Sequence, residues 1–210
     1  MTAATRKPEP VLIVGLGETE LSCARFFDRA GEPFEVADNR ADPPGLAAFR
    51  QRWPDARISL GPFDSRRFSR ARRIVMSPGV SLQEPAIAAA AQAGVECIGD
   101  IELFARAADA PVIAITGSNG KSTVTMMAGR LLEAAGYRVR MGGNLGPPAL
   151  DLLADGAEAP DFYVLELSSF QLETTFSLQA AAATVLNVSA DHMDRYRSLA
   201  EYAAAKGRIY

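Results

Sequence analysis

The residues best suited to chemistry lie in a glycine-rich segment near the middle of the chain, Thr116–Thr123, with the sequence TGSNGKST. An apolar run precedes it and an amphipathic stretch follows, so we expect it to join a buried strand to a helix. Glycines let such a loop turn its N–H groups inward, and the helix end adds partial positive charge. The segment therefore predicts a phosphate-binding loop, of the spacing GxxGKST rather than GxxxxGK, because Ile115 stands where the earlier glycine would be.

Each residue type in this loop has an expected task. Lys121 is expected to reach the terminal phosphates of a nucleoside triphosphate, and the Ser122 hydroxyl to complete a magnesium shell. A glycine-rich turn with a solvated lysine is the alternative. The expected nucleotide-binding residues are Gly117, Ser118, Asn119, Gly120, Lys121, Ser122 and Thr123.

Two further side chains follow apolar runs. Glu166 lies near the carboxyl end of the run FYVLEL, at the sheet edge where α/β proteins bind ligands. A carboxylate within a buried strand is costly unless it is paired or bound to metal, although a solvent-facing glutamate is the alternative. His192, the only histidine, follows a run that ends at Val188, which places it at the same edge. An ordinary surface or core histidine is the alternative there.

Apolar runs alternate with helical patterns along the chain, which predicts an α/β protein with parallel, helix-covered sheets. The expected strands are residues 11–15, 33–38, 57–60, 73–76, 95–99, 112–116, 138–141, 162–167 and 183–188. The expected helices are residues 19–30, 45–53, 85–93, 122–135 and 198–206. Within 122–135, one face is expected to carry Val124, Met127, Leu131, Leu132 and Ala135.

The sequence Asp109-Ala110-Pro111 separates the two series of elements, so we expect domains at 1–110 and 111–210. The second series has roughly four strands, fewer than the five or six of a typical sheet. The chain then stops at Tyr210 without a closing strand. We therefore expect the second domain to be truncated.

The run VLIVGLG, residues 11–17, opens like a dinucleotide-binding fingerprint. The third glycine of GxGxxG is missing, because position 20 is Glu20. A side chain there obstructs the close helix–strand approach, and its negative charge opposes a pyrophosphate at the helix end. NAD binding is therefore a minor alternative.

Composition excludes several classes of protein. With 48% hydrophobic and 22% charged residues the chain is globular, and its net charge of −3 gives no electrostatic case for nucleic acid or an anionic membrane surface. No apolar run approaches the length of about 20 residues that a membrane span needs. The N-terminal MTAATRKPEP lacks the apolar core of a signal peptide, and Cys23 and Cys97 have no metal or disulfide spacing. These features predict a cytoplasmic protein.

The phosphate loop TGSNGKST resembles that of the Mur ligase family, which includes folylpolyglutamate synthase. The likeness continues through GDIELF (99–104), GGNLG (142–146), LELSSFQLE (165–173), NVSADHMDRY (187–196) and AAKGRIY (204–210), which resemble the D-glutamate-adding branch. It implies a Rossmann-like N-terminal domain followed by an incomplete P-loop-type ATPase domain. A further C-terminal domain of the family has no counterpart in this chain.

The resemblance implies ATP and two Mg²⁺ ions as cofactors. Ser122 and Glu166 match ligands of magnesium, and His192 matches a ligand of the second ion, with Asp191 orienting it. On composition alone Lys206 is a solvated lysine on an alanine-rich helix; in the family the matching lysine is carbamylated and supplies oxygen to the second metal. Such a reaction needs the neutral amine, which partial burial favours. The implied catalytic residues are Lys121, His192 and Lys206.

The resemblance also gives the first domain a UDP-sugar site in place of NAD. Its implied substrate-binding residues are Glu18, Thr19, Asp38, Asn39, Arg40, Ser77, Gly79, Asn144, Ser168 and Gln171. Loop-capping amides are the alternative for Asn144 and Gln171. The chain departs from the family at Glu18 and Glu20, where the family carries leucine and glycine, and this puts the local pyrophosphate contacts in question.

The implied function is ATP-dependent addition of D-glutamate to UDP-N-acetylmuramoyl-L-alanine through an acyl phosphate, by a monomer without nucleic-acid or membrane partners. The chain alone is expected to bind the UDP-substrate, to bind ATP weakly, and to turn over little. Another ligase of the family, such as an alanine-adding or folate-type enzyme, is one alternative. A non-catalytic nucleotide-binding module is the other.

Overall fold

The computed structural model describes residues 9–153 and 158–210. By its internal contacts the chain divides into two compact units, the first ending at Ile98 and the second running from Gly99 to Tyr210. Residues 1–8, which carry most of the N-terminal stretch used to exclude a signal peptide, lie outside the described residues. Among the described helices, none has the length and apolar character needed to cross a membrane.

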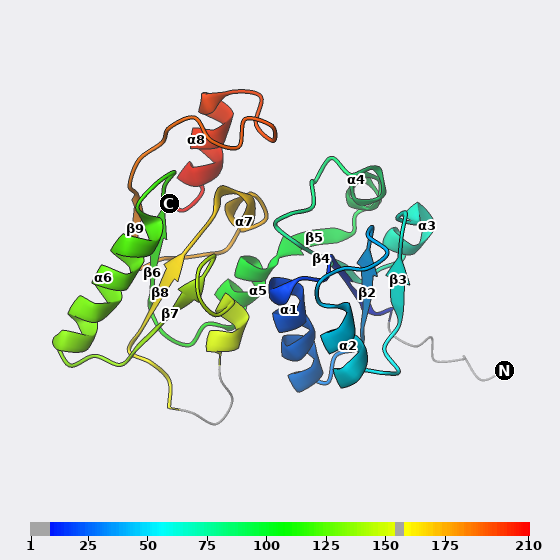
Figure 1. Ribbon diagram of the computed structural model, residues 1–210, viewed down its shortest axis with the longest axis horizontal. Helices are drawn as coiled ribbons and strands as arrows, with labels where there is room; N and C mark the ends of the chain where they lie inside the picture. The colour runs from blue at the N-terminus through cyan, green and yellow to red at the C-terminus, as the bar shows by residue number, and fades with distance from the viewer. Residues whose placement is uncertain (1–8, 154–157) are drawn as a thin grey trace. The chain divides into compact units, whose positions relative to one another are not determined.

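The first unit is built on a five-stranded sheet of order β3-β2-β1-β4-β5 (Figure 1). Strand β1 runs parallel to β2 and β4, and β2 runs parallel to β3. The strands are β1 (Val11–Val14), β2 (Phe34–Asp38), β3 (Ile58–Leu60), β4 (Arg73–Met76) and β5 (Glu96–Gly99). The helices are α1 (Glu18–Arg29), α2 (Leu46–Arg52), α3 (Ser65–Phe68) and α4 (Pro85–Gln92).

Helices cover both faces of this sheet because β1 is apolar throughout. Leu12 and Val14 pack in a buried cluster with Ile87 of α4 and Phe68 of α3. Their neighbours Val11 and Ile13 point to the opposite face, since side chains alternate along a strand. All four are buried. A continuous apolar strand is typical of a parallel sheet covered on both sides, so the prediction of this fold class is confirmed.

The second unit contains a four-stranded sheet of order β7-β8-β6-β9, parallel at every paired edge. Its strands are β6 (Val112–Thr116), β7 (Val139–Gly143), β8 (Phe162–Glu166) and β9 (Ala182–Val185). Its helices are α5 (Asp100–Ala107), α6 (Lys121–Ala134), η1 (Ala149–Leu152), α7 (Ser169–Glu173) and α8 (Leu199–Gly207).

Two expectations about this unit differ from the structure. We expected the first domain to end at residue 110, but α5 packs against η1 and α7, so the contacts divide the chain before Gly99. The face of α6 expected to carry Met127 and Leu131 is also not its packed face, because these two side chains are 58% and 69% exposed. The helix instead buries Thr125 and Gly129. Gly129 lies so close to β7 that an added Cβ would meet the Met141 sulfur at 1.9 Å.

Gly143, at the end of β7, sets the spacing between β7 and β8. Its φ of +106° lies in the left-handed region, and an added Cβ would lie 2.3 Å from the Glu166 carbonyl oxygen. Gly136, which follows α6, has a similar φ of +92° but nothing within 4 Å of such a Cβ. Alanine substitutions at these two glycines therefore separate the free-energy cost of backbone conformation from that of a steric clash.

We predict that Gly143→Ala lowers the free energy of unfolding of the second unit by about 3 kcal/mol or more, because conformational strain and backbone overlap add. Gly136→Ala is the matched control and costs about 1–2 kcal/mol from conformation alone. Urea denaturation followed by circular dichroism measures both. Equal losses in the two variants would show that the β7–β8 spacing tolerates a methyl group.

Candidate active site

The loop between β6 and α6 has the backbone of an anion-binding turn. Gly120, immediately before the first turn of α6, has a φ of +81°, which glycine adopts without strain. Lys121 lies folded over the loop, its Nζ donating to the carbonyl oxygens of Gly117 at 3.0 Å and Ser118 at 3.1 Å. A free helix amino end and an ammonium group therefore meet at one place, as phosphate binding requires.

The segment after β9 holds this loop in place. The Asn119 N–H donates to Asn187 Oδ1 at 2.9 Å, and Asn187 Nδ2 donates back to the Asn119 carbonyl at 3.0 Å. The Ser118 hydroxyl accepts from the Ser189 N–H at 3.0 Å. Ser118 and Asn119 thus use their polar groups to position the loop.

Glu166 lies at the carboxyl end of β8, next to the phosphate loop, and is only 2% exposed. Ser122 Oγ donates to its Oε2 at 2.7 Å, and Asn144 Nδ2 donates to its Oε1 at 2.7 Å. The buried carboxylate is therefore satisfied on both oxygens. The structure brings together three residues that the sequence analysis selected from three separate segments.

Lys206 lies in the same cluster, which composition alone did not indicate. It is 1% exposed, and its Nζ donates to the Gly117 carbonyl at 2.9 Å. The ammonium also lies 4.5 Å from the centre of the Tyr202 ring. Burial, and then the charge of Lys121, lower the pKa of Lys206 to about 8, against a smaller opposing effect of Asp191. A substantial neutral fraction therefore exists near neutral pH.

His192 follows β9 and lies among aromatic side chains. Its ring packs against Phe170 at 4.9 Å and Tyr202 at 6.3 Å, and Asp191 accepts its backbone N–H at 2.9 Å. It is exposed, with a left-handed φ of 54°. Within the described part of the chain it shares no hydrogen bond with Glu166 or Lys206. Nor does any group of three or more histidine, cysteine or acidic side chains gather there.

With Lys206 unmodified, the residues present fit one divalent cation. The Ser122 hydroxyl and the Glu166 carboxylate are hard oxygen donors 2.7 Å apart beside the phosphate loop, which suits magnesium. A second ion needs His192 together with an oxygen on Lys206, which unmodified lysine lacks.

Five of the residues expected to bind substrate line a cavity of about 290 Å³ at the carboxyl ends of β1, β2 and β4. In a doubly wound sheet this edge, where the strand order reverses, is the usual ligand position. They are Asp38, Asn39, Arg40, Ser77 and Gly79. Gly15, Phe63, Val80 and Glu84 complete the lining.

Asp38 is buried within this cavity and bound by Arg40. Arg40 Nε donates to Oδ1 at 2.9 Å and Nη2 to Oδ2 at 2.6 Å. Burial alone would raise the pKa of Asp38, but the hydrogen bonds and charge of Arg40 outweigh burial and hold the pKa below its usual value. The carboxylate is therefore an ionised acceptor at neutral pH.

Other residues expected to bind substrate have partners elsewhere. Glu18 is exposed and pairs with Arg25 at 2.9 Å, and the Thr19 carbonyl accepts the Ser22 hydroxyl at 2.7 Å. Ser168 and Gln171 form a capping box at the start of α7, and Gln171 Nε2 also donates to Asp100 at 3.1 Å. For Gln171 these contacts match the capping alternative.

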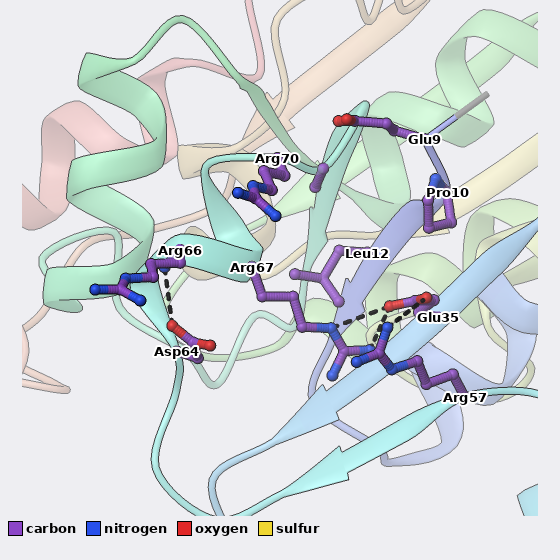
Figure 2. A pocket seen from close by; sticks show the side chains of 10 residues that line it. Glu9, Pro10, Leu12, Glu35, Arg57, Asp64, Arg66, Arg67 and Arg70 are labelled. Carbon is purple, nitrogen blue, oxygen red and sulfur yellow. Dashed lines mark hydrogen bonds and ion pairs between the residues drawn. The ribbon is translucent and has the colours of Figure 1, made fainter. Parts of the chain in front are cut away.

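A second hollow in the first unit, of about 430 Å³, was not anticipated from the sequence. It is lined by the arginines 57, 66, 67 and 70, with Glu35 between two of them (Figure 2). Arg67 Nη2 donates to Glu35 at 2.5 Å and Arg57 lies 3.6 Å from it. The arginine-rich run RRFSRARR was the available signal. In Figure 2 dashed lines join Glu35 to Arg57 and Arg67, so Glu35 neutralises part of this positive charge.

Comparisons with known proteins cover most of the chain. Residues 9–99 match the model of a Mur ligase MurD-like N-terminal domain, and residues 115–210 match that of the Mur ligase middle domain. The chain is 59% identical over 199 residues to a UDP-N-acetylmuramoylalanine--D-glutamate ligase from Marinobacter nauticus, covering 95% of this chain and 44% of that protein. It is 56% identical over 206 residues to the ligase of that name from Methylobacillus flagellatus, covering 97% and 45%.

The fold also resembles that of solved structures. The UDP-N-acetylmuramate:L-alanyl-gamma-D-glutamyl-meso-diaminopimelate ligase from Neisseria meningitides superimposes with a TM-score of 0.58 at 18% identity, over 97% of this chain and 68% of that one. At this identity the likeness concerns the fold alone. The chain spans less than half the length of the curated relatives it matches.

We predict that burial of Lys206 makes stability depend on pH. Its folded pKa of about 8 lies below the ordinary value of 10.5, so between these values the unfolded chain binds more protons and stability rises with pH. Relative to Lys206→Met, the wild-type chain should gain about 2 kcal/mol in unfolding free energy between pH 7 and pH 9.5. Urea titrations at several pH values measure this difference. Curves that run parallel for the two proteins would contradict it.

Proposed function

Because this chain belongs to the Mur ligase family, with a MurD-like N-terminal domain followed by the middle domain, we propose that it carries the nucleotide sites of a D-glutamate-adding ligase. The reaction joins D-glutamate to UDP-N-acetylmuramoyl-L-alanine at the expense of ATP. The observation that carries the proposal is the hydrogen bond between Ser122 of the phosphate loop and Glu166, 2.7 Å long. Relatives of that name at 56–59% identity support it.

In the first step the L-alanine carboxylate attacks the γ-phosphorus of ATP, which forms an acyl phosphate and releases ADP. In the second, the amine of D-glutamate attacks the acyl carbon and phosphate leaves. Catalysis of this kind depends on positioning and charge neutralisation, so no side chain needs to act as a nucleophile. When ATP binds, Lys121 gives up its hydrogen bonds to the carbonyl oxygens of Gly117 and Ser118 and donates to the terminal phosphates instead. The loop residues 117–123 also donate to these phosphates.

Ser122 and Glu166 would hold the first Mg²⁺, and His192 with carbamylated Lys206 the second, which is the arrangement that the family resemblance implies. When bound, the ions supply positive charge against the transferring phosphoryl group. Buried Lys206 suits the modification: its neutral amine adds to carbon dioxide, loses a proton and becomes an anionic carbamate. The lowered pKa of Lys206, about 8, supports this step.

The first unit holds the UDP-substrate in the cavity that contains Asp38. Asp38 accepts hydrogen bonds from the uracil, while Arg40, Ser77 and Gly79 lie along the same wall and Thr19 contributes a backbone N–H to phosphate. We assign Asn144, Ser168 and Gln171 to the muramoyl-alanine end, as the resemblance implies. Gln171 must then give up its bonds to Ser168 or Asp100.

We further propose a monomer that acts in the cytoplasm, where Cys23 and Cys97 stay reduced; both are free thiols in this structure. The chain alone should bind both nucleotides but turn over little, because the curated relatives are more than twice as long. Normal ligase turnover by the 210-residue chain would contradict this last point.

We predict that Lys121→Ala weakens ATP binding by at least about tenfold, since a charge-assisted contact with phosphate is lost. Arg130→Ala, on the exposed face of the same helix, is the control and should leave ATP affinity unchanged. Isothermal titration of ATP with Mg²⁺ measures both. Unchanged affinity in Lys121→Ala would favour a module that does not use the phosphate loop.

We predict that UDP-N-acetylmuramoyl-L-alanine binds the chain several-fold more tightly than the same nucleotide without alanine. Asp38→Ala should weaken both by about tenfold, because the uridine end loses its acceptor. Arg70→Ala, in the arginine-lined hollow, is the control. If Arg70→Ala lost nucleotide binding and Asp38→Ala kept it, the nucleotide site would lie in the arginine-lined hollow instead.

A further inference from the structure

Glu20 is a buried acidic side chain at the amino end of α1, a helix of 12 residues. Its side chain is only 4% exposed, and the Gly17 N–H donates to its Oε2 at 2.8 Å. Its second oxygen, Oε1, is buried and forms no hydrogen bond of good geometry among the described residues, although the Ser77 hydroxyl lies near enough to favour the ionised form of the carboxyl group. One carboxylate oxygen thus takes a free N–H of the helix end while the other has no well-formed hydrogen bond.

This carboxyl group adjoins the nucleotide cavity. A Cβ placed on Gly15 would lie 2.7 Å from Ser77 Cβ and 3.4 Å from Glu20 Cδ, so the three residues meet at one point. Gly15 and Ser77 both line the cavity. Asp38 and Arg40, also in its lining, interact electrostatically with Glu20.

A phosphate of the bound nucleotide competes for the same place. The turn between β1 and α1 lies at the carboxyl end of the central strand, where the helix amino end favours an anion. The Gly17 N–H that would point to a phosphate already serves the Glu20 carboxylate. Two anions close together at low dielectric repel strongly, so an ionised Glu20 and a phosphate exclude one another.

We propose that Glu20 is an internal competitor of the phosphate in this cavity, so that binding of a nucleoside diphosphate is coupled to uptake of one proton by Glu20. The inference rests on the proposed uridine-nucleotide site. Protonation removes the repulsion and turns the carboxyl group into a hydrogen-bond donor for the phosphate.

The surroundings of Glu20 favour this protonation. Burial raises its pKa above the ordinary value, the Gly17 N–H and the Ser77 hydroxyl oppose the shift, and Asp38 adds to it. Arg40 is the cation that faces the group, and its guanidinium is bound to Asp38. A bound diphosphate adds negative charge and raises the pKa of Glu20 further. Nucleotide affinity therefore falls as pH rises, by up to about tenfold per pH unit while one proton is taken up.

A purely structural role predicts something different. At the third position of α1, Glu20 forms a capping box with the Gly17 N–H, which stabilises many helices. If capping were its only task, Glu20→Gln would change stability but leave proton uptake and nucleotide affinity unaltered. The burial of Oε1 without a well-formed hydrogen bond, next to Gly15 and Ser77 of the cavity lining, is what favours the second role.

Isothermal titration of the full chain with UDP tests the proposal, between pH 7.5 and 9, above the second ionisation of phosphate at about pH 6. Comparing two buffers of different ionisation enthalpy counts the protons. The wild-type chain should take up about one proton, whereas Glu20→Gln should take up none and bind UDP at least about tenfold more tightly at pH 8.5. Uridine, which lacks phosphate, should bind wild type and variant alike. Asp28→Asn, which removes a charge from the far end of α1, is the control and should behave as wild type.

Three results would overturn the proposal. UDP binding to the wild-type chain without proton uptake would remove the coupling and leave the uridine-nucleotide site standing. Uptake that persists in Glu20→Gln would assign the proton to another group. Absence of UDP and uridine binding in both proteins would overturn the inference and the proposed site together. Because the proton count is made on the wild-type chain, the test holds even if Glu20→Gln fails to fold.

Discussion

The second unit depends on how a buried carboxylate is satisfied. Glu166 ends a strand whose three preceding residues are fully buried, and water does not reach it. Its two oxygens are paired by Ser122, from the loop after β6, and by Asn144, from the loop after β7. Removal of either donor leaves a buried charge short of a partner, which is expensive. The Glu166 side chain therefore connects the phosphate loop to β8 and to the loop after β7.

Backbone packing reinforces that connection. Gly143 allows β7 to approach the Glu166 carbonyl closely, and the Asn144 N–H donates to that carbonyl at 2.8 Å. On the other side, Asn187 and Ser189 hold the loop from beyond β9. The loop is thus positioned before any nucleotide arrives, which lowers the entropic cost of binding.

Much of this organisation was predictable from the sequence, because its causes are local. The apolar runs 11–14 and 162–165 are uninterrupted, so strand identity and parallel pairing followed from them. Glu166 and the phosphate loop were placed together because parallel strands bring their carboxyl ends to one edge. Asp38 and Ser77, by contrast, were selected only through the resemblance to the Mur ligase family.

The features that escaped prediction depend on contacts between distant segments. On composition alone Lys206 looks solvated on an alanine-rich helix, so only the family resemblance selected it; the packing of α8 against the phosphate loop buries it. The buried face of α6 depends on Gly129 meeting Met141, a contact that periodicity does not encode. The helix Asp100–Ala107 was assigned to the first domain because a proline follows it, whereas its contacts lie with α7 and η1.

Lys121 and Lys206 share one hydrogen-bond acceptor: both ammonium groups donate to the carbonyl oxygen of Gly117. The charge of Lys121 therefore disfavours a proton on Lys206. An incoming anion that draws Lys121 away from Gly117 relaxes that repulsion. Loss of the charge on Lys206 strengthens the hydrogen bond between Lys121 and the Gly117 carbonyl. Occupancy of the loop and the ionic form of the buried amine are consequently reciprocal, in the sense of thermodynamic linkage.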